Sequence, residues 1–455
     1  MSINSQKIPF DPAKWPFFYG WFMILAAGLG ILSSIPGQTF GVSAFTEPLI
    51  ESLPIDRTGI SLAYMLGTAG SALLLTWGGK AYDAWGARIT GFAAASLMGL
   101  VLLSLSRLEW LIESLTGALG ESRREAVAFA LLAVGFLVLR FSGQGVLTMA
   151  SRNMLMKWFD HRRGLANGII GLFVPVVFSV SPLLLNLLVL RQGWRQAWFT
   201  LGVGALLGVG LFILVFFRDN PESCGLRPDG GLQPLPNDPR HDPVRDFTLK
   251  EARRTLRFWV FNLTIALHAL ISTALTFHIV SIFDQAMIDQ KKAFAIFIPS
   301  SIITVFMAFF CGWISDHIRL KKLLFVLMAG TAIAIGGIFL LNRPAGYWLV
   351  VLGNGIAGGV FGLLMTVSWP RFFGRRHLGA ISGFHMSWVV GFSAVGPYLM
   401  GLSLQHFGSY RPSFTVCLAG LAILFILALG IDRPARPNAS GANRSKPSPQ
   451  PPPAR

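Results

Sequence analysis

Charged residues and cysteines are scarce in this chain of 455 residues. Asp, Glu, Lys and Arg together make up only 13% of the sequence, about half the share found in an ordinary soluble domain. The three cysteines, Cys224, Cys311 and Cys417, lie far apart, and none forms a CxxC pair or a Cys/His cluster. The scarcity argues against a soluble globular fold, a disulfide scaffold and a zinc site.

Long apolar runs take the place of the missing charge. Hydrophobic residues make up 53% of the chain, and the mean hydropathy is +0.58. A helix needs about 20 mostly apolar residues to cross a bilayer, and we find about twelve such stretches. They are residues 17–46, 58–78, 89–107, 125–150, 164–190, 196–217, 258–282, 293–314, 322–341, 346–369, 379–404 and 411–431. The sequence therefore predicts an all-α polytopic membrane protein.

The formal net charge of +17 reflects an excess of basic residues, which are unevenly distributed between the two sides of the predicted spans. Roughly 27 Lys and Arg residues fall on the side of the two termini and about 10 on the other side. Such a bias marks the cytoplasmic side, so we expect a multi-pass protein of the cell (inner) membrane with both termini in the cytoplasm. The same bias favours contact with anionic membrane lipids, and nucleic acid is not an expected partner.

The predicted spans divide into two groups of six around a polar segment. Thr248 and Glu251 have the spacing of a capping box, so we expect a short amphipathic helix in this linker. Residues 108–124 are too short and too charged to span, and they predict an interfacial helix on the outer side. The expected domains are a cytoplasmic N-terminus (1–16), a six-helix bundle (17–217), the linker (218–257), a second six-helix bundle (258–431) and a disordered cytoplasmic tail (432–455).

The two halves contain related loops after the fourth and tenth predicted spans. One offset pairs Phe159 with Phe372, and it also pairs Arg162 and Arg163 with the two arginines at 375 and 376. Repeats of six helices with a binding site between them are a recognised transporter architecture. We therefore expect the site to lie between two bundles.

A motif that can form a contact between helices lies between the second and third spans. Residues 79–88 read GKAYDAWGAR. The glycines Gly79 and Gly86 permit a tight turn and a close helix approach, and the Asp83 carboxylate can face a helix N-terminus. The run, which ends in Arg88, closely resembles the G-x-x-x-D-x-x-G-x-[RK] loop of the major facilitator superfamily. The resemblance implies two six-helix bundles with a latch that opens when the bundles rock.

The matching loop after the eighth span departs from this pattern. It contains Gly312 and Asp316, but Arg319 stands where the second glycine belongs. We therefore expect a weaker or different latch in this half. The gating residues predicted from both halves are Gly79, Asp83, Gly86, Arg88, Gly312, Asp316, Arg319, Arg162, Arg163, Arg375 and Arg376.

The fourth span carries a charged motif, Arg140 followed by Gln144 and Gly145. It resembles the R-x-x-x-x-G motif of the same superfamily. A guanidinium inside the membrane is costly unless it faces a cavity or a partner. Arg140 is therefore interpreted either as an anion-binding or proton-steering group, or as a structural arginine tied to carbonyl groups of neighbouring helices.

Further matches narrow the resemblance within this superfamily. Residues 157–168 read KWFDHRRGLANG, and they resemble the [YW]-F-x-x-R-R-x-L-A-x-G signature of the monocarboxylate transporters and oxalate:formate antiporters. This resemblance implies small organic anions as substrates, exchanged or coupled to a proton. However, the eighth span has no charged residue and the first and eleventh have no lysine, which leaves Arg140 as the expected intramembrane cation.

Other polar residues of the predicted spans complete the candidate site. Gln38, beside Pro36-Gly37, also marks an expected break in the first span. The histidines are interpreted either as proton carriers or as neutral side chains bonded between helices. Gly353 to Gly358 match G-x-G-x-x-G, but inside an apolar span these glycines indicate helix packing rather than a nucleotide site. The candidates are Arg140, Gln38, Gln144, His268, Asn354, His385 and Trp388.

The sequence as a whole predicts a secondary active transporter for a small organic anion or a similar metabolite, with proton coupling. We expect a monomer with no enzymatic activity, no cofactor and no metal, whose partners are its substrate, protons and lipids. One alternative is a proton-coupled exporter of amphipathic compounds, for which the 37 phenylalanines could line a cavity. Another is a sensor that binds a solute without moving it.

Overall fold

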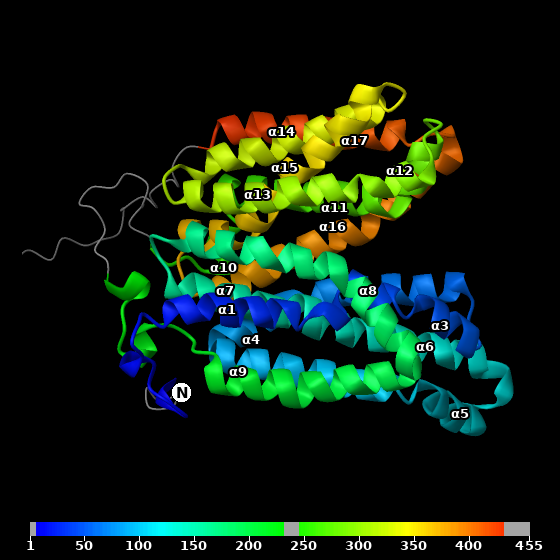
Figure 1. Cartoon of the computed structure of the whole chain (residues 1–455), viewed down its shortest axis with the longest axis horizontal. Coiled ribbons are helices and arrows are strands. Elements are labelled where there is room, and N and C mark those ends of the chain that lie inside the picture. Colours follow the sequence, from blue (N-terminus) through cyan, green and yellow to red (C-terminus); the bar gives the residue numbers. More distant parts are fainter. Residues whose placement is uncertain (1–5, 232–244, 432–455) are drawn as a thin grey trace, which may run out of the picture.

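The computed structural model describes residues 6–231 and 245–431. These residues form helices and connecting segments, with no strand among them. Figure 1 shows the helices in two layers, with α13 to α15 and α17 in the upper part and α1, α4, α6 and α9 in the lower part. The predicted all-α fold is therefore confirmed for the described residues. The predicted tail, 432–455, and the middle of the linker lie outside them.

Nine helices of the described chain are long and apolar enough to cross a membrane. Two of them contain a glycine with a positive φ that separates two helical segments: Gly86 (φ 80°, ψ 175°) and Gly193 (φ 76°, ψ 160°). Each of these two glycines lies between two of the predicted spans. A residue other than glycine is strained at such angles, so the glycines set where one span ends and the next begins.

The N-terminal half packs its helices around a continuous apolar core. Its π-helical segments, η5 and η6, each interrupt an apolar helix. The elements are α1 (Gly20–Leu32), α2 (Thr39–Ser43), α3 (Thr46–Ser52), α4 (Arg57–Leu105), α5 (Leu108–Leu119), α6 (Arg124–Leu139), η5 (Arg140–Leu147), α7 (Thr148–Trp158), α8 (Arg163–Val203), η6 (Gly204–Val209) and α9 (Gly210–Phe216).

The C-terminal half follows the linker and is built from long apolar helices. The linker holds α10 (Leu249–Ala252), where Thr248 and Glu251 form the predicted capping box. At four residues this helix is shorter than a typical interfacial helix. The remaining elements are α11 (Leu256–Asp284), α12 (Gln290–Ala295), α13 (Phe297–Ser315), α14 (Leu320–Phe339), α15 (Pro344–Phe373), α16 (Leu378–Phe407) and α17 (Arg411–Leu429).

The first predicted span is broken, as its Pro36-Gly37 pair predicts. Helix α1 ends at Leu32, a 3₁₀ turn covers Ile35–Gly37, and α2 begins at Thr39. Proline cannot donate a backbone hydrogen bond, so a regular helix is interrupted at this point. The break exposes backbone groups beside the fourth span, where the charged motif lies.

Helix α5 confirms the helix predicted within residues 108–124. It lies at the end of the molecule opposite the N-terminus (Figure 1). Leu108 and Ile112 are buried on one face, whereas Trp110 is 63% exposed on another. Glu109 also accepts a hydrogen bond from Nε of Arg195 at 2.8 Å, which ties α5 to the segment that follows Gly193. The helix is therefore amphipathic and fixed to the N-terminal half.

The two halves meet along two helix pairs, α4 with α16 and α8 with α13. We call the end of the bundles that carries Asp83, Asp316 and the linker the latch end, and the other the distal end. Trp158, Trp369, Tyr19 and Tyr82 are among the largest fully buried side chains. The closest approaches between the halves involve glycines at the latch end.

Candidate functional site

The break in the first span lies directly against the π-helical segment η5. A Cβ atom on Gly37 would lie 2.6 Å from the carbonyl oxygen of Leu139 and 2.9 Å from Cα of Gly143. Only glycine allows this approach of the two backbones. Short π-helical segments inside α-helices occur frequently at functional sites. The sequence therefore brings two irregular backbones together at one place in the N-terminal bundle.

Arg140 is the first residue of η5 and is only 3% exposed. Its Nη1 donates to the carbonyl oxygen of Gly37 at 3.3 Å and to Oγ1 of Thr39 at 3.2 Å. The guanidinium lies 5.2 Å from the ring centroid of Tyr64, and its Nε has no hydrogen-bond partner in the described structure. Arg140 thus faces the first and second spans, with a single nitrogen bonded to a carbonyl and a hydroxyl.

The two predicted glutamines differ in how their polar atoms are used. Nε2 of Gln38 donates to Oγ of Ser34 at 2.9 Å and to Oγ1 of Thr148 at 3.4 Å. Thr148 in turn donates to Ser34 at 3.0 Å, which closes a small network between α1 and α7. Oε1 of Gln144, one helical turn after Arg140, is buried without a partner among the described residues. Gln144 therefore keeps an acceptor free.

Two predicted residues of the C-terminal half do not join this cluster. His268 is buried between α11 and α14, where its Nδ1 lies 2.9 Å from Oγ1 of Thr331 and its ring packs against Phe361. Asn354 is half-buried on α15. Its neighbour Gly353 packs closely against the backbone of α14 at Ala334. The interpretation of these glycines as packing residues is therefore confirmed.

His385 and Trp388 both lie on α16, and they occupy different surroundings. His385 is 1% exposed, with Nδ1 2.8 Å from Oδ1 of Asn262 on α11. Its ring centroid lies 4.4 Å from that of Trp369, and its Nε2 has no partner in the described structure. Trp388 packs against Trp259 with centroids 5.3 Å apart and lines a groove.

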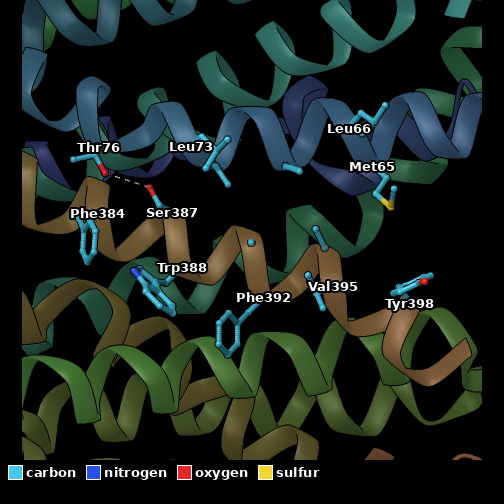
Figure 2. Close-up of a pocket in the computed structure, with 14 residues that line it drawn as sticks. Met65, Leu66, Leu73, Thr76, Phe384, Ser387, Trp388, Phe392, Val395 and Tyr398 are labelled. Atoms are coloured by element: carbon cyan, nitrogen blue, oxygen red, sulfur yellow. Dashed lines mark hydrogen bonds between the residues drawn. The ribbon is translucent and has the colours of Figure 1, made fainter. Parts of the chain in front are cut away.

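This groove lies between α4 and α16 and has a volume of about 570 Å³. Figure 2 shows Met65, Leu73 and Thr76 on α4 across from Ser387 and Tyr398 on α16. Oγ1 of Thr76 and Oγ of Ser387 are 3.4 Å apart at its narrow end. Most of the other side chains that line it are apolar or aromatic, Phe384, Trp388 and Phe392 among them. The two bundles are therefore separated here by an apolar crevice.

Arg140 is not the only arginine inside the helices, which corrects the sequence prediction. Arg152 belongs to α7, within the helical stretch Glu121–Trp158. Its Nη1 donates to Oγ1 of Thr366 on α15 at 2.8 Å, across the interface between the halves. The predicted fourth span ends at residue 150, so the sequence analysis places Arg152 in a loop. The continuous helix through the end of α7 brings it into the interior.

Two more polar side chains of α7 were missed for the same reason. Nδ2 of Asn153 donates to Oγ of Ser382 on α16 at 2.6 Å. The ammonium of Lys157 lies 4.7 Å from the ring centroid of Tyr82 on α4. A prediction based on hydropathy ends the span at residue 150. These polar residues could have been selected only by continuing the predicted helix beyond that boundary.

Asp83 makes the contact that the superfamily motif predicts. Its carboxylate accepts from the backbone N–H groups of Gly379 at 2.7 Å and Ala380 at 2.8 Å. These are the first-turn N–H groups of α16, which have no acceptor within the helix. A carboxylate at this place also interacts favourably with the helix dipole, by about 0.3–1 kcal/mol. Asp83 therefore joins the N-terminal half to the C-terminal half.

Asp316 makes the reciprocal contact, and the latch expected to be weaker or different in this half differs from the first by an added ion pair. Its carboxylate accepts from the N–H groups of Gly164 at 2.8 Å and Leu165 at 2.9 Å, in the first turn of α8. Nη2 of Arg371 adds an ion pair at 3.1 Å. Arg319 is exposed at the start of α14 and does not alter this geometry. The carboxylate, not the second glycine, decides whether the contact forms.

Glycines allow the helices to approach at both latches. A Cβ atom on Gly79 would overlap the carbonyl oxygen of Gly379. A Cβ atom on Gly312 would lie 2.7 Å from Cα of Gly168. Neither position has room for a Cβ atom, because the helices approach more closely than a side chain allows. The latch end is therefore closed by direct backbone packing between the halves.

Gly86 and Arg88 form the turn between the second and third spans. The backbone N–H of Arg88 donates to Oδ1 of Asp219 at 3.0 Å, and its Nη2 donates to the carbonyl oxygen of Ile8. A Cβ atom on Gly86 would overlap the Asp219 carboxylate. Burial raises the pKa of the Asp219 carboxyl above its ordinary value, while hydrogen bonds from this turn act in the opposite direction. Asp219 is a further residue that the sequence analysis did not select.

The paired arginines of the two related loops have different roles in the structure. Arg163 is buried and donates from Nε to the carbonyl oxygens of Met156 and Phe159, whereas Arg162 is exposed. Arg375 forms an ion pair with Glu222 at 2.6 Å and donates to the carbonyl oxygen of Lys157. Arg376 is exposed, and its backbone N–H donates to Asp246 at 3.2 Å. Of these four side chains, Arg375 connects the halves.

A family model and one curated relative match parts of this sequence. A sequence model of the Major Facilitator Superfamily matches residues 17–388. A curated relative, the probable sulfoacetate transporter SauU of Cupriavidus necator, is 30% identical over 175 residues. That alignment covers 37% of this chain and 39% of the relative, so the chain matches well under half of the relative's length.

Solved structures share the fold at low sequence identity. A bacterial homologue of the iron transporter ferroportin aligns with a TM-score of 0.65 and 15% identity, over 89% of this chain and 98% of that one. The human organic anion transporter MFSD10 aligns with a TM-score of 0.58 and 14% identity, over 89% and 98%. The xylose symporter XylE, as a double Trp mutant, aligns with a TM-score of 0.60 and 14% identity, over 90% and 94%. At such identities the likeness concerns the arrangement of helices alone.

Proposed function

The chain belongs to the major facilitator superfamily, and from that premise we propose that it carries a small organic anion, of the monocarboxylate kind, across the membrane by alternating access. Its family and fold are those of membrane transporters rather than enzymes. Beyond the family, we propose the class of substrate, the residue that binds it and which end of the bundles faces the cytoplasm. One chain supplies both bundles, so a monomer can carry out this mechanism.

The observation that carries the proposal is the state of Arg140. Its guanidinium is held between the first, second and fourth spans, and no carboxylate of the described chain pairs with it. A buried cation without an anionic partner is unfavourable by several kcal/mol. An anionic substrate would supply that partner. The relative SauU is described as a probable sulfoacetate transporter, and sulfoacetate is a small organic anion.

The experiment that tests the proposal is uptake into vesicles. Purified protein is first screened by thermal shift against carboxylates, sulfonates, sugars, amino acids and drugs, and a radiolabelled hit is then used for transport. We expect Arg140→Gln to reduce uptake at least about tenfold, as loss of a charge-assisted hydrogen bond implies. Arg57→Gln is the matched control, because Arg57 is exposed and pairs with Glu47 away from the site. Equal uptake by the Arg140→Gln and wild-type proteins would remove the anion-binding role.

The proposed orientation places the latch end in the cytoplasm. This end carries the described linker residues and the loops that are rich in Lys and Arg, and in membrane proteins such residues concentrate on the cytoplasmic side. In that orientation the latches of Asp83 and Asp316 close the cytoplasmic face. A cysteine introduced at exposed Arg319 should therefore react with a membrane-impermeant maleimide in inside-out vesicles and remain unlabelled in intact cells.

Proton coupling is part of the proposal, and His385 is its candidate carrier. The ring lies on α16, about one turn from Ser382, which bonds to Asn153 of the other half. One of its nitrogens is bonded to Asn262 and the other has no partner in the described structure. His268 is a poorer candidate, because it packs inside the C-terminal bundle against Thr331. A pH step across the vesicle membrane should drive uptake by the wild-type protein and not by His385→Gln.

A second candidate function, export of amphipathic compounds, is favoured by one observation. The groove between α4 and α16 is apolar and rich in aromatic side chains, among them Trp388 and Phe392. A pocket of this kind is typical of sites for drug-sized apolar ligands. A panel of toxic compounds tested on a deletion strain separates the two functions. Protection that is lost in Trp388→Ala and kept in Arg140→Gln would identify an exporter.

A further inference from the structure

Arg152 is a second cation of the helices, half-buried, that lacks a counter-charge among the described residues. No acidic side chain of residues 6–231 or 245–431 forms an ion pair with it. Its Nη1 donates to Oγ1 of Thr366 at 2.8 Å and lies 3.5 Å from the carbonyl oxygen of Gly362, both neutral groups of α15. Its Nε is buried without a partner in the described structure. Neutral acceptors offset only part of the cost of desolvating a guanidinium.

The surroundings of Arg152 come from both halves of the molecule. Arg152 stands on α7 of the N-terminal half, and Thr366 stands on α15 of the C-terminal half. The residue after Arg152, Asn153, donates to Oγ of Ser382 on α16 at 2.6 Å, about one turn before His385. A group bound here would therefore touch both bundles at once. Arg140, in contrast, is bonded only to residues of the N-terminal half.

Several buried polar atoms around this place have no partner among the described residues. They include Nε2 of His385 and Nδ2 of Asn262, whose residues are 1% and 0% exposed. The two side chains are joined by a hydrogen bond of 2.8 Å between Nδ1 of His385 and Oδ1 of Asn262. Buried polar atoms are nearly always paired in proteins, so unpaired ones point to a ligand or to water. Amide N–H and guanidinium groups suit an oxyanion. Because Nδ1–H of His385 donates to Oδ1 of Asn262, Nε2 donates to an oxyanion when the imidazole is protonated.

We propose that Arg152, His385 and Asn262, with Thr366, form a second anion site that takes the carboxylate or sulfonate group of a small organic anion at the interface of the bundles. The site is distinct from that of Arg140, because it lies on the latch side along the same helical stretch and reaches the opposite half. In naming the transported anion as its occupant, the inference rests on the proposed function. The anion passes from Arg140 to this site as the substrate moves toward the latch end.

The experiment measures stabilisation of purified protein by small anions, in a background where the first site is removed. A ligand that binds only the folded state raises the free energy of unfolding in proportion to the logarithm of its concentration. The Arg140→Gln protein is titrated with acetate, with methanesulfonate and with chloride, and acetamide serves as the uncharged analogue of acetate. The same series is run on the double variants Arg140→Gln/Arg152→Gln and Arg140→Gln/Arg152→Lys.

The expected result is an anion-dependent thermal shift that depends on Arg152. Acetate or methanesulfonate should stabilise the Arg140→Gln protein, and the apparent affinity should fall about tenfold or more when Arg152 becomes Gln. The Lys variant should keep part of the shift, since it keeps the charge. Arg140→Gln/Thr366→Val keeps Arg152 itself and should bind more weakly than its parent, because the C-terminal half no longer holds the guanidinium.

Four outcomes would overturn the inference. An equal shift with and without Arg152 would show that the residue only joins the bundles through Thr366. A shift with chloride but not with acetate or methanesulfonate would assign the site to an inorganic anion instead of a transported one. A shift with acetamide equal to that with acetate, or none with any anion, would show that no charge is recognised.

Two comparisons keep this result separate from the proposed function. Arg227→Gln removes the same charge from an exposed position of the linker and should leave every anion-dependent shift unchanged. The single variant Arg152→Gln is also compared with Arg140→Gln. If Arg140 binds no anion, Arg140→Gln will match the wild-type protein while Arg152→Gln still loses affinity. Loss in neither single variant argues against both sites.

Discussion

At the scale of single residues, two arginines carry charge into the helices without a carboxylate partner in the described part of the chain. Arg140 bonds to the broken first span and Arg152 to α15. Each is held by neutral groups that orient the guanidinium without neutralising it. An oriented guanidinium without a carboxylate partner can bind a mobile anion, because the anion forms the ion pair that the protein itself does not provide.

A glycine at the latch gives a prediction at the same scale. Gly79→Ala adds a methyl group that overlaps the carbonyl oxygen of Gly379, which should disfavour the closed latch by about 1–3 kcal/mol. A tenfold change in the closed population corresponds to about 1.4 kcal/mol. The reporter is a cysteine at Ser315, a buried residue of the latch, in a chain whose three native cysteines are replaced by alanine. Its labelling by maleimide should accelerate several-fold.

The matched control for this prediction is Gly336→Ala. Gly336 lies in α14, and a Cβ atom placed on it would meet no other heavy atom within 4 Å. Both substitutions lower helix flexibility to the same extent, so they differ only in the collision at the latch. Unchanged labelling in Gly79→Ala would mean that α4 and α16 separate and repack at little cost.

Individual residues were predicted from the sequence to the extent that a motif or a charge pointed to them. Arg140 and Asp83 stand in recognisable motifs, and their neighbours in space follow from those motifs. Arg152 escaped because the predicted fourth span ends at residue 150, whereas the helix continues through α7 to Trp158.

At the scale of elements, the latch consists of two carboxylates placed at two helix N-termini. Asp83 accepts from the first turn of α16 and Asp316 from the first turn of α8. Each half therefore provides one carboxylate and one helix end. The first contact was expected from its motif, and the second was expected to be weaker or different because a glycine is missing. Its difference lies in Arg371, which pairs with Asp316 and belongs to no part of the motif.

The latch of Asp316 gives a pH prediction. Burial raises the pKa of its carboxyl above the ordinary 3.8, although hydrogen bonds and Arg371 oppose this. In the open state the carboxyl is solvated and has its ordinary pKa, so the closed state binds the proton more tightly. Protonation therefore favours closure, and the closed state loses stability as the pH rises from 3.8 through the raised pKa. Maleimide labelling at Ser315→Cys should increase over this interval.

Asp316→Asn provides the control, since it removes the titrating group and keeps one acceptor oxygen. Thiol reactivity itself changes with pH, so the labelling rate of the protein that retains Asp316 is divided by that of the Asp316→Asn protein at each pH. A ratio that does not change with pH would mean that the carboxyl titrates alike in the two states. A ratio that falls as the pH rises would reverse the sign assigned here.

The irregular elements were predicted unequally. The break at Pro36-Gly37 could be anticipated because proline cannot continue the hydrogen-bond ladder of a helix. The π-helical segments η5 and η6 could not, because no residue pattern in them marks the change to i→i+5 hydrogen bonding. The α5 helix was expected from its spacing of apolar residues, and it is present.

At the scale of the whole molecule, the two halves are in contact at the latch end and are separated by the groove between α4 and α16. Alternating access requires that these contacts exchange, with the latch opening as the distal end closes. Hydropathy alone predicted the class of fold, and the related loops predicted two halves. Which end is closed in this structure depends on tertiary contacts that no single segment specifies.

A cross-link between the halves tests this movement. Oγ1 of Thr76 and Oγ of Ser387 are 3.4 Å apart, so the two side chains are in contact. A disulfide between cysteines at these positions would hold α4 and α16 together. With the native cysteines replaced, Thr76→Cys/Ser387→Cys should lose transport on oxidation and regain it on reduction. Each single cysteine variant is the control and should transport under both conditions. Full transport by the oxidised double variant, with the cross-link verified by mass spectrometry, would contradict rigid rocking at this place.

Helix α5 makes the two halves unequal with respect to the bilayer. It is amphipathic, it is tied by Glu109 to Arg195, and it presents Trp110 outward. An indole ring in such a position prefers the headgroup region. Tilting the N-terminal half would lift this helix out of the headgroups or press it into the acyl chains, and either displacement is unfavourable. The N-terminal half should therefore keep its depth and inclination in the lipid, while the C-terminal half performs most of the swing.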